Sequence, residues 1–226
     1  MNHTAITNGD AQPKFSTPLR AAANFFSYLF HPLFIPVIAT WYLAFIHEGY
    51  FIGIPPHNKG VVLLTVGLLT IVFPGVTVLL LKGLGFIKSM FLKTQRERII
   101  PYVAANLFYF CLYLLFRHQQ EVPAILDAFI FGVFLASSAG LFFNTYYKIS
   151  MHALGMGALC GLMLLIIYIN SPYTIFPSAM IVFLITGIVC TSRLIISDHA
   201  PFDIYTGVFF GILCQVIAAA FIGING

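Results

Sequence analysis

Residues 61–81 read VVLLTVGLLTIVFPGVTVLLL, a run without a single charged side chain. A helix of about 20 apolar residues is long enough to cross the hydrocarbon core of a bilayer. A membrane β-strand would alternate apolar and polar positions instead, and neither this run nor Ala128–Phe143 follows that pattern. The stretch therefore predicts a membrane-spanning helix.

The rest of the chain has the same character. Hydrophobic residues make up 60% of the sequence and charged residues 8%, with a mean hydropathy of +0.95, whereas a soluble domain carries about 25% charged residues. We expect an all-α, polytopic integral membrane helix bundle of six to seven transmembrane helices, with a polar tail over residues 1–20 and one transmembrane domain over residues 21–226. The expected spans are Ala23–Ile46, Gly60–Leu81, Ile99–Phe116, Ala124–Thr145, His152–Ile169, Phe176–Thr191 and Pro201–Ile224.

The formal net charge of +4 indicates an anionic partner. The basic residues stand at the ends of the apolar segments rather than in a soluble basic patch, so lipid head groups suit them better than nucleic acid. The four cysteines lie singly within apolar segments and show no metal-ligand spacing. We therefore expect a bilayer and a lipid as partners, and neither nucleic acid nor a metal.

Residues 191–203 read TSRLIISDHAPFD and place ionisable groups between two apolar runs. Such groups in a membrane protein are costly and usually functional. Arg193 suits bidentate binding of phosphate, and His199 suits attack or proton transfer. Pro201 favours a helix start, which puts Asp203 in the first turn, within reach of His199. Asp198 is the alternative orienter, and the structural alternative is an ion pair between Arg193 and one of the two carboxylates.

A second cluster, KISMH, occupies residues 148–152 before the fifth expected span. Ser150 can donate to an anion, and His152 can protonate a leaving group because its ordinary pKa is about 6.5. The alternative interpretation is a helix-capping serine beside an interfacial histidine.

A third group of polar residues, KTQRERIIP, occupies residues 93–101 at the start of the third span. Three cations, Lys93, Arg96 and Arg98, surround one carboxylate, Glu97. Cations at a helix N-terminus oppose the helix dipole, and a bound phosphate would reverse that penalty. The alternative is an ordinary basic loop at the membrane interface.

Counting spans places all three clusters on one side of the membrane. The sequence therefore predicts that Lys93, Ser150, His152, Arg193 and His199 converge on one pocket at that face. Lysine and arginine are more frequent on this side, which favours a cytoplasmic location by the positive-inside rule.

Together the clusters resemble, in order, the three signatures of the type-2 phosphatidic acid phosphatase superfamily, K-x6-R-P, P-S-G-H and S-R-x5-H-x3-D. In the first, Lys93 and Pro101 occupy the ends. Ile100 stands where the family has arginine, so Arg98 or Arg96 must replace it.

In the second signature Ser150 and His152 match, while Ile149 and Met151 replace the proline and the glycine. The third signature matches at Ser192, Arg193, His199 and Asp203. Family members usually carry the first two signatures in one loop, whereas two expected spans separate them here. An even number of spans returns the chain to the same side, so the site can still assemble.

The resemblance implies a metal-independent membrane phosphatase that needs no cofactor and hydrolyses a lipid phosphate monoester or diphosphate through a phosphohistidine. It implies catalytic roles for His199 as nucleophile, His152 as acid and Asp203 as orienter. The phosphate-binding residues that it implies are Lys93, Arg98, Arg96, Ser150 and Arg193. The alternatives are a non-catalytic lipid-phosphate binding or transport protein and a lipid phosphotransferase that uses the same pocket.

We expect the protein in the bacterial cytoplasmic (inner) membrane. The resemblance implies an active site on its outer face, opposite to the face that the charges favour. Two further features concern packing. The repeats Gly157-x3-Gly161 and Gly207-x3-Gly211 predict close helix approach. His31, next to Pro32, either lines the pocket or is a buried histidine beside a proline kink.

Overall fold

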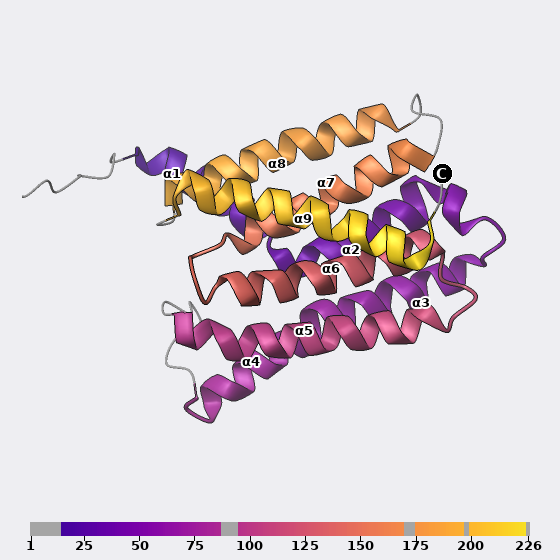
Figure 1. Cartoon of the computed structure of the whole chain (residues 1–226), viewed down its shortest axis with the longest axis horizontal. Coiled ribbons are helices and arrows are strands. Elements are labelled where there is room, and N and C mark those ends of the chain that lie inside the picture. Colours follow the sequence, from indigo (N-terminus) through magenta and orange to yellow (C-terminus); the bar gives the residue numbers. More distant parts are fainter. Residues whose placement is uncertain (1–14, 87–94, 170–174, 197–198, 225–226) are drawn as a thin grey trace, which may run out of the picture.

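The computed structural model describes residues 15–86, 95–169, 175–196 and 199–224. Over these ranges it contains helices and no strand, and seven helical segments are long and apolar enough to cross a membrane. They lie roughly along one direction and form an elongated bundle (Figure 1). The prediction of an all-α integral membrane bundle is confirmed.

The first two spans are each built from several pieces. The first consists of α1 (Thr17–Leu29), the 3-10 turn η1 (Pro32–Phe34), α2 (Ile35–Trp41) and the π-helical turn η2 (Tyr42–Ile46). After the 3-10 turn η3 (Glu48–Phe51), the second consists of α3 (Pro56–Gly67), the π-helical turn η4 (Leu68–Val72) and α4 (Phe73–Gly83). Proline in the first two residues of η1, α2 and α4 explains the breaks before these pieces, since it lacks the N–H that a continuous helix needs.

The other five spans are continuous helices, and several extend beyond the apolar runs. They are α5 (Gln95–Arg117), α6 (Ala124–Phe143), α7 (Met151–Ile169), α8 (Phe176–Ile196) and α9 (Pro201–Ile222). The first span also begins earlier than expected, at Thr17. Apolar length alone ends a span at its first charged residue, but a helix continues past it because a charged side chain at its end reaches back to water. As a result Arg193 lies in the last turn of α8, not in the expected loop.

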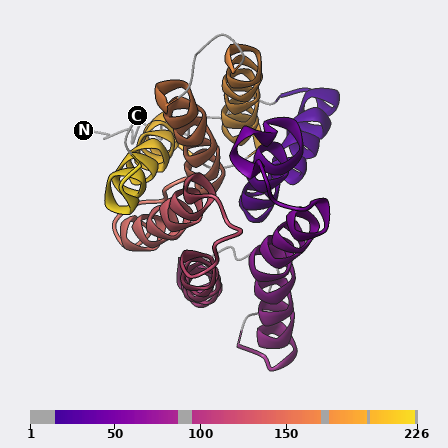
Figure 2. The same ribbon diagram turned by 90° about the vertical axis from the view of Figure 1, so that its right-hand side faces the viewer.

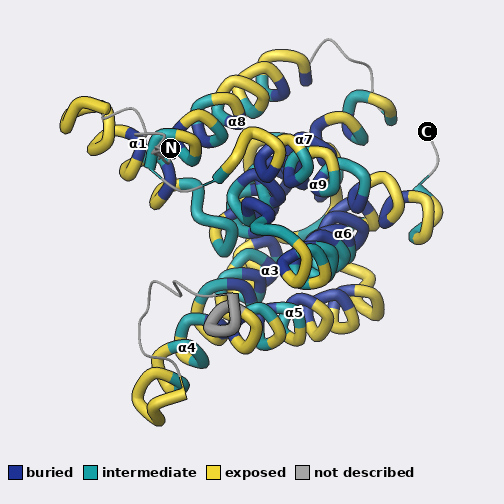
Figure 3. Tube along the Cα trace, turned by 60° about the vertical axis from the view of Figure 1, so that its left-hand side comes forward, coloured by how far each residue is buried: buried dark blue, intermediate teal, exposed yellow. Residues whose placement is uncertain are grey.

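The interior of the bundle is formed by α6 and α7. Within each, 61% of the most apolar window is buried, against 22% in α8 and in the second span. Figure 3 shows the buried stretches of α6 and α7 near the centre and the exposed stretches on the outer helices. Large apolar side chains such as Leu64 and Leu184 are exposed there, which is the arrangement that hydrocarbon chains of a bilayer stabilise.

The tightest helix contact joins α7 and α9, which run parallel. A Cβ atom on Gly157 would lie 2.4 Å from the Val208 carbonyl oxygen, and one on Gly211 would lie 2.3 Å from that of Leu154. A Cβ atom on Gly207 would lie 2.9 Å from the Ser150 carbonyl oxygen. The close approach predicted from the spaced glycines is therefore confirmed.

The helix ends that carry the three polar clusters lie at one end of the bundle. The last turn of α8 and the first turns of α5, α7 and α9 all lie at the left-hand end of Figure 1. Figure 2, which looks along the helices, shows α9 beside α6 and α7, with the first two spans across the bundle. Counting spans in the sequence placed these helix ends on one common side of the membrane, and in the structure they lie at one common end of the bundle.

Gly211→Ala tests the α7–α9 contact. The new methyl group meets backbone atoms of α7, which cannot turn away, so the helices must separate. We expect a loss of about 1–3 kcal/mol in the free energy of unfolding, measured by denaturant unfolding in detergent. Gly187→Ala in α8 is the matched control, because nothing lies within 4 Å of its Cβ position. Equal stability of the two variants would contradict the packing described here.

Candidate functional site

A cavity of about 680 Å³ opens between the first span, α4, α5, α6, α7 and the end of α8. Its polar lining gathers near the end where the three clusters meet. The polar side chains in its lining include Asn24, Ser27, His31, Lys148, His152, Arg193 and His199, together with Ser137 and the tyrosines Tyr28, Tyr102 and Tyr109. No carboxylate lines the cavity among the described residues, so its charged lining is cationic and suits an anion.

The other part of the cavity is mainly apolar and extends along the helices. Val133 of α6, Ala105 of α5 and Ala158 of α7 line it. Ala158 comes seven residues after Met151, the first residue of α7, and a helix rises about 1.5 Å per residue, so this lining reaches about 10 Å along α7. The cavity thus combines a cationic end with an apolar interior.

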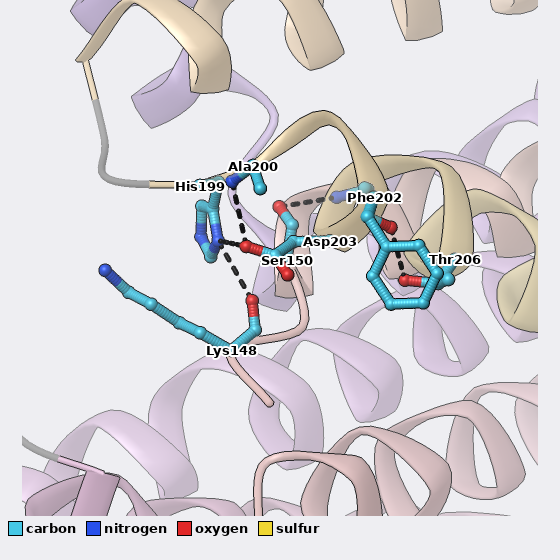
Figure 4. A network of polar contacts seen from close by, with 8 residues as sticks. Lys148, Ser150, His199, Ala200, Phe202, Asp203 and Thr206 are labelled. Atoms are coloured by element: carbon cyan, nitrogen blue, oxygen red, sulfur yellow. Dashed lines mark hydrogen bonds and ion pairs between the residues drawn. The ribbon is translucent and has the colours of Figure 1, made fainter. Parts of the chain in front are cut away.

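His199 is held by two acceptors. Its Nδ1 lies 3.1 Å from the main-chain oxygen of Lys148 and 3.5 Å from Oδ2 of Asp203 (Figure 4). A carbonyl oxygen only accepts, so Nδ1 carries the proton. In the neutral imidazole the lone pair is therefore on Nε2, which is the nitrogen available for attack on phosphorus.

The surroundings of His199 favour its neutral form. Burial lowers the pKa of its imidazole, as do the positive charges of Arg193 and Lys148, while Asp203 opposes them. The side chain is only 7% exposed. Lowering the pKa below the ordinary value of 6.5 keeps the imidazole unprotonated, and so nucleophilic, at neutral pH.

Asp203 both caps α9 and orients His199, as the sequence predicts. Its Oδ2 accepts from the Ala200 N–H at 2.9 Å, and Pro201 opens the helix. Its own main-chain oxygen accepts from the Ser150 N–H at 3.2 Å. This backbone contact ties the segment before α7 to the start of α9. Asp198, the alternative orienter, lies outside the described residues.

Ser150 stands behind the cavity rather than in its lining. The residue is completely buried, and its hydroxyl accepts from the Ala153 N–H at 3.4 Å. This is the position of a helix N-cap, which agrees with the structural interpretation of the second cluster. The predicted phosphate contact of Ser150 therefore finds no support in its geometry.

His152 does line the cavity, and a break in the first span orients it. Pro32 has no N–H, so the His31 N–H bonds to the Tyr28 oxygen at 3.3 Å instead of continuing the α-helical pattern. The Ser27 oxygen then accepts from Nε2 of His152 at 3.1 Å. Because this oxygen only accepts, Nδ1 of His152 is the nitrogen left to exchange a proton with a ligand.

Arg193 lies at the centre of the polar end. Its guanidinium interacts electrostatically with His31, His152 and His199, and it lines the same cavity. The neighbouring Ser192 donates to the Ile188 oxygen within its own helix. The third signature thus contributes its arginine and histidine to the cavity and keeps its serine in α8.

The cluster at residues 93–101 is only partly described. Lys93 lies outside the described residues, and the structure gives Arg96 and Arg98 helical backbone in the first turn of α5 without describing their side chains. Pro101 and Tyr102, in the next turn, line the cavity. The start of α5 therefore reaches the site.

Three contributors to the site were not assigned roles from the sequence. Two are main-chain oxygens, those of Lys148 and Ser27, which any residue type supplies and no motif reveals. The third is the Lys148 side chain, which lines the cavity and was noted only as part of the second cluster. Its position four residues before His152 is the sequence feature that could have indicated this role.

Comparisons of the chain with models of protein families, with curated proteins and with solved structures gave no match.

Proposed function

We propose that this integral membrane protein is a phosphatase of the bacterial cytoplasmic membrane that hydrolyses a lipid phosphate monoester or diphosphate through a phosphohistidine. The observation that carries the proposal is the state of His199. Its Nδ1 is committed to two acceptors, which leaves Nε2 as the nucleophile in a cationic cavity. The order of the three clusters, which resembles that of the type-2 phosphatidic acid phosphatase superfamily, agrees with this chemistry.

The reaction has two steps. Nε2 of His199 attacks phosphorus, a P–N bond forms and the P–O bond to the lipid breaks. The leaving oxygen takes the proton that the phosphate monoanion brings in, and this proton passes through Nδ1 of His152 because Nε2 keeps its own proton on the Ser27 oxygen. The phosphorylated imidazole is cationic because Nδ1 keeps its proton, and Asp203 stabilises that charge. In the second step water attacks phosphorus, His152 takes a proton from it, and the P–N bond breaks.

Arg193 and Lys148 supply positive charge for the phosphate oxygens. In phosphoryl transfer most of the catalysis is positioning and stabilisation of charge on these oxygens. Of the two candidates in α5, helical periodicity favours Arg98. Position 98 is three residues before Pro101 and four before Tyr102, so it shares a helix face with these cavity-lining residues, whereas position 96 does not.

The apolar interior of the cavity favours a lipid over a soluble phosphate ester. A ligand whose phosphate meets Arg193 and His199 has the lining around Val133 and Ala158 available for its hydrocarbon part. Burying that part there removes apolar surface from water, which is favourable by about 25 cal/mol per Å².

His199→Ala and Asp203→Asn test the mechanism. Losing the nucleophile should lower kcat by about 10³-fold or more. Replacing the orienting carboxylate by an amide should lower it by roughly 10²- to 10⁴-fold, because the tautomer and the phosphoimidazolium lose their support. Phosphate release from a panel of lipid phosphates, measured in detergent without added metal, gives both values.

The same assay separates the alternatives. Tight binding of lipid phosphates with no phosphate release by the native protein would identify a binding or transport protein. Transfer of the phosphoryl group to an added acceptor lipid instead of water would identify a phosphotransferase. Undiminished activity of His199→Ala would eliminate the phosphohistidine.

The pH profile tests the electrostatics of His199. Activity requires the neutral imidazole, so kcat/KM falls as pH drops through the pKa of His199, which lies below 6.5. Lys148→Gln removes one charge that lowers this pKa but keeps the main-chain oxygen. We expect its acid limb to move to higher pH. Lys82→Gln, at the end of α4 and outside the cavity lining, is the control and should leave the limb unchanged.

Arg98→Gln tests the assignment within the cluster at residues 93–101. Loss of a charge-assisted contact to phosphate should lower kcat/KM by roughly 10- to 100-fold. Arg96→Gln removes the same charge from the same helical turn and is the matched control, expected to change kcat/KM less than about 3-fold. The reverse order of the two effects would assign the role to Arg96.

A further inference from the structure

We propose that His31 is a third imidazole of the site, which donates from Nε2 to a phosphate oxygen of the bound substrate. This inference rests on the proposed function and adds to it a residue from the first span, far from the three clusters in the sequence. Its four supports are the position of His31 in the cavity, its tautomer, its place beside His152 and the charge around it.

His31 lies at the break between α1 and η1 and lines the polar end of the cavity. Its Nδ1 accepts from the Leu33 N–H at 3.4 Å and so caps the turn that begins at Pro32. A nitrogen that accepts carries no proton in the neutral ring, so the proton is on Nε2. The nitrogen not used in the cap is therefore a donor.

The rings of His31 and His152 meet edge to face, with centroids 5.4 Å apart and an interplanar angle of 86°. One nitrogen of each imidazole is hydrogen-bonded to a main-chain atom of the first span. His152 donates from Nε2 to the Ser27 oxygen, and His31 accepts at Nδ1. The second nitrogens, Nδ1 of His152 and Nε2 of His31, remain for a ligand in the cavity that both residues line.

The charge around this pair selects an anion. Arg193 interacts electrostatically with both rings, and the described lining carries no carboxylate. An N–H donor beside a guanidinium is placed to bind an oxygen of a phosphate group. With His152 serving the leaving oxygen, an adjacent donor suits one of the non-bridging oxygens of the same phosphate group.

Three substitutions separate this role from capping. Asn keeps a short acceptor for the Leu33 N–H and loses the distal donor. Gln places an amide N–H near the position of Nε2 and loses the cap. Met has the length of Gln with neither group. The measurements are kcat/KM for a lipid phosphate in detergent, the affinity for inorganic phosphate by calorimetry, and the thermal midpoint of unfolding.

We expect His31→Asn to lower kcat/KM by about 10- to 100-fold while the thermal midpoint of unfolding stays unchanged. The kcat/KM of His31→Gln should be about 10-fold higher than that of His31→Met. His31→Asn with native kcat/KM, or Gln and Met variants of equal activity, would overturn the proposal. If His31→Asn does not fold, the comparison of Gln with Met decides alone.

Phosphate binding keeps this inference separate from the proposed function. A native protein that binds inorganic phosphate but hydrolyses no lipid phosphate contradicts the phosphatase, and weaker phosphate binding by His31→Asn then still supports the donor role. A native protein that hydrolyses lipid phosphates while His31→Asn is unimpaired contradicts the role of His31 alone. A native protein that neither binds inorganic phosphate nor hydrolyses a lipid phosphate would contradict both the proposed function and the role of His31.

Discussion

The close backbone contact between α7 and α9 is the constraint on which the site depends. Only glycine at positions 157 and 211 lets the two helices approach this far, because a Cβ at either would meet carbonyl oxygens of the partner helix. At this separation the Ser150 N–H reaches the Asp203 main-chain oxygen. The same approach brings the Lys148 carbonyl to His199. A packing contact within the membrane thus fixes the tautomer of a histidine at its edge.

The helix break at Pro32 is a second constraint, and it orients a histidine on the other side of the cavity. The missing N–H of proline redirects the His31 N–H, and the Ser27 oxygen holds His152. The two histidines with proposed catalytic roles are therefore both oriented by main-chain oxygens, and His199 has the carboxylate of Asp203 as well. Main-chain acceptors suit a membrane site because they add no net charge to a region where an unpaired charge is costly.

The sequence predicted the fold class, a bundle of six to seven spans and the common side of the helix ends that carry the clusters, because each follows from apolar length and the alternation of loops. Span ends were less accurate. Arg193 lies within α8 since a helix continues past its first charged residue, and α1 begins at Thr17. Ser150 matched a motif by residue type, yet its hydroxyl caps α7, because a serine before a helix satisfies its backbone.

By itself the sequence determined that the chain is a polytopic membrane bundle and that His152, Arg193 and His199 stand near the ends of spans on one side. These are consequences of hydropathy and order along the chain. Only the tertiary structure decided which atoms orient the two histidines, that His31 joins them, and that the cationic end continues into an apolar cavity. Those features depend on main-chain oxygens and on surfaces contributed by helices distant in sequence, and neither leaves a residue pattern that can be read in advance.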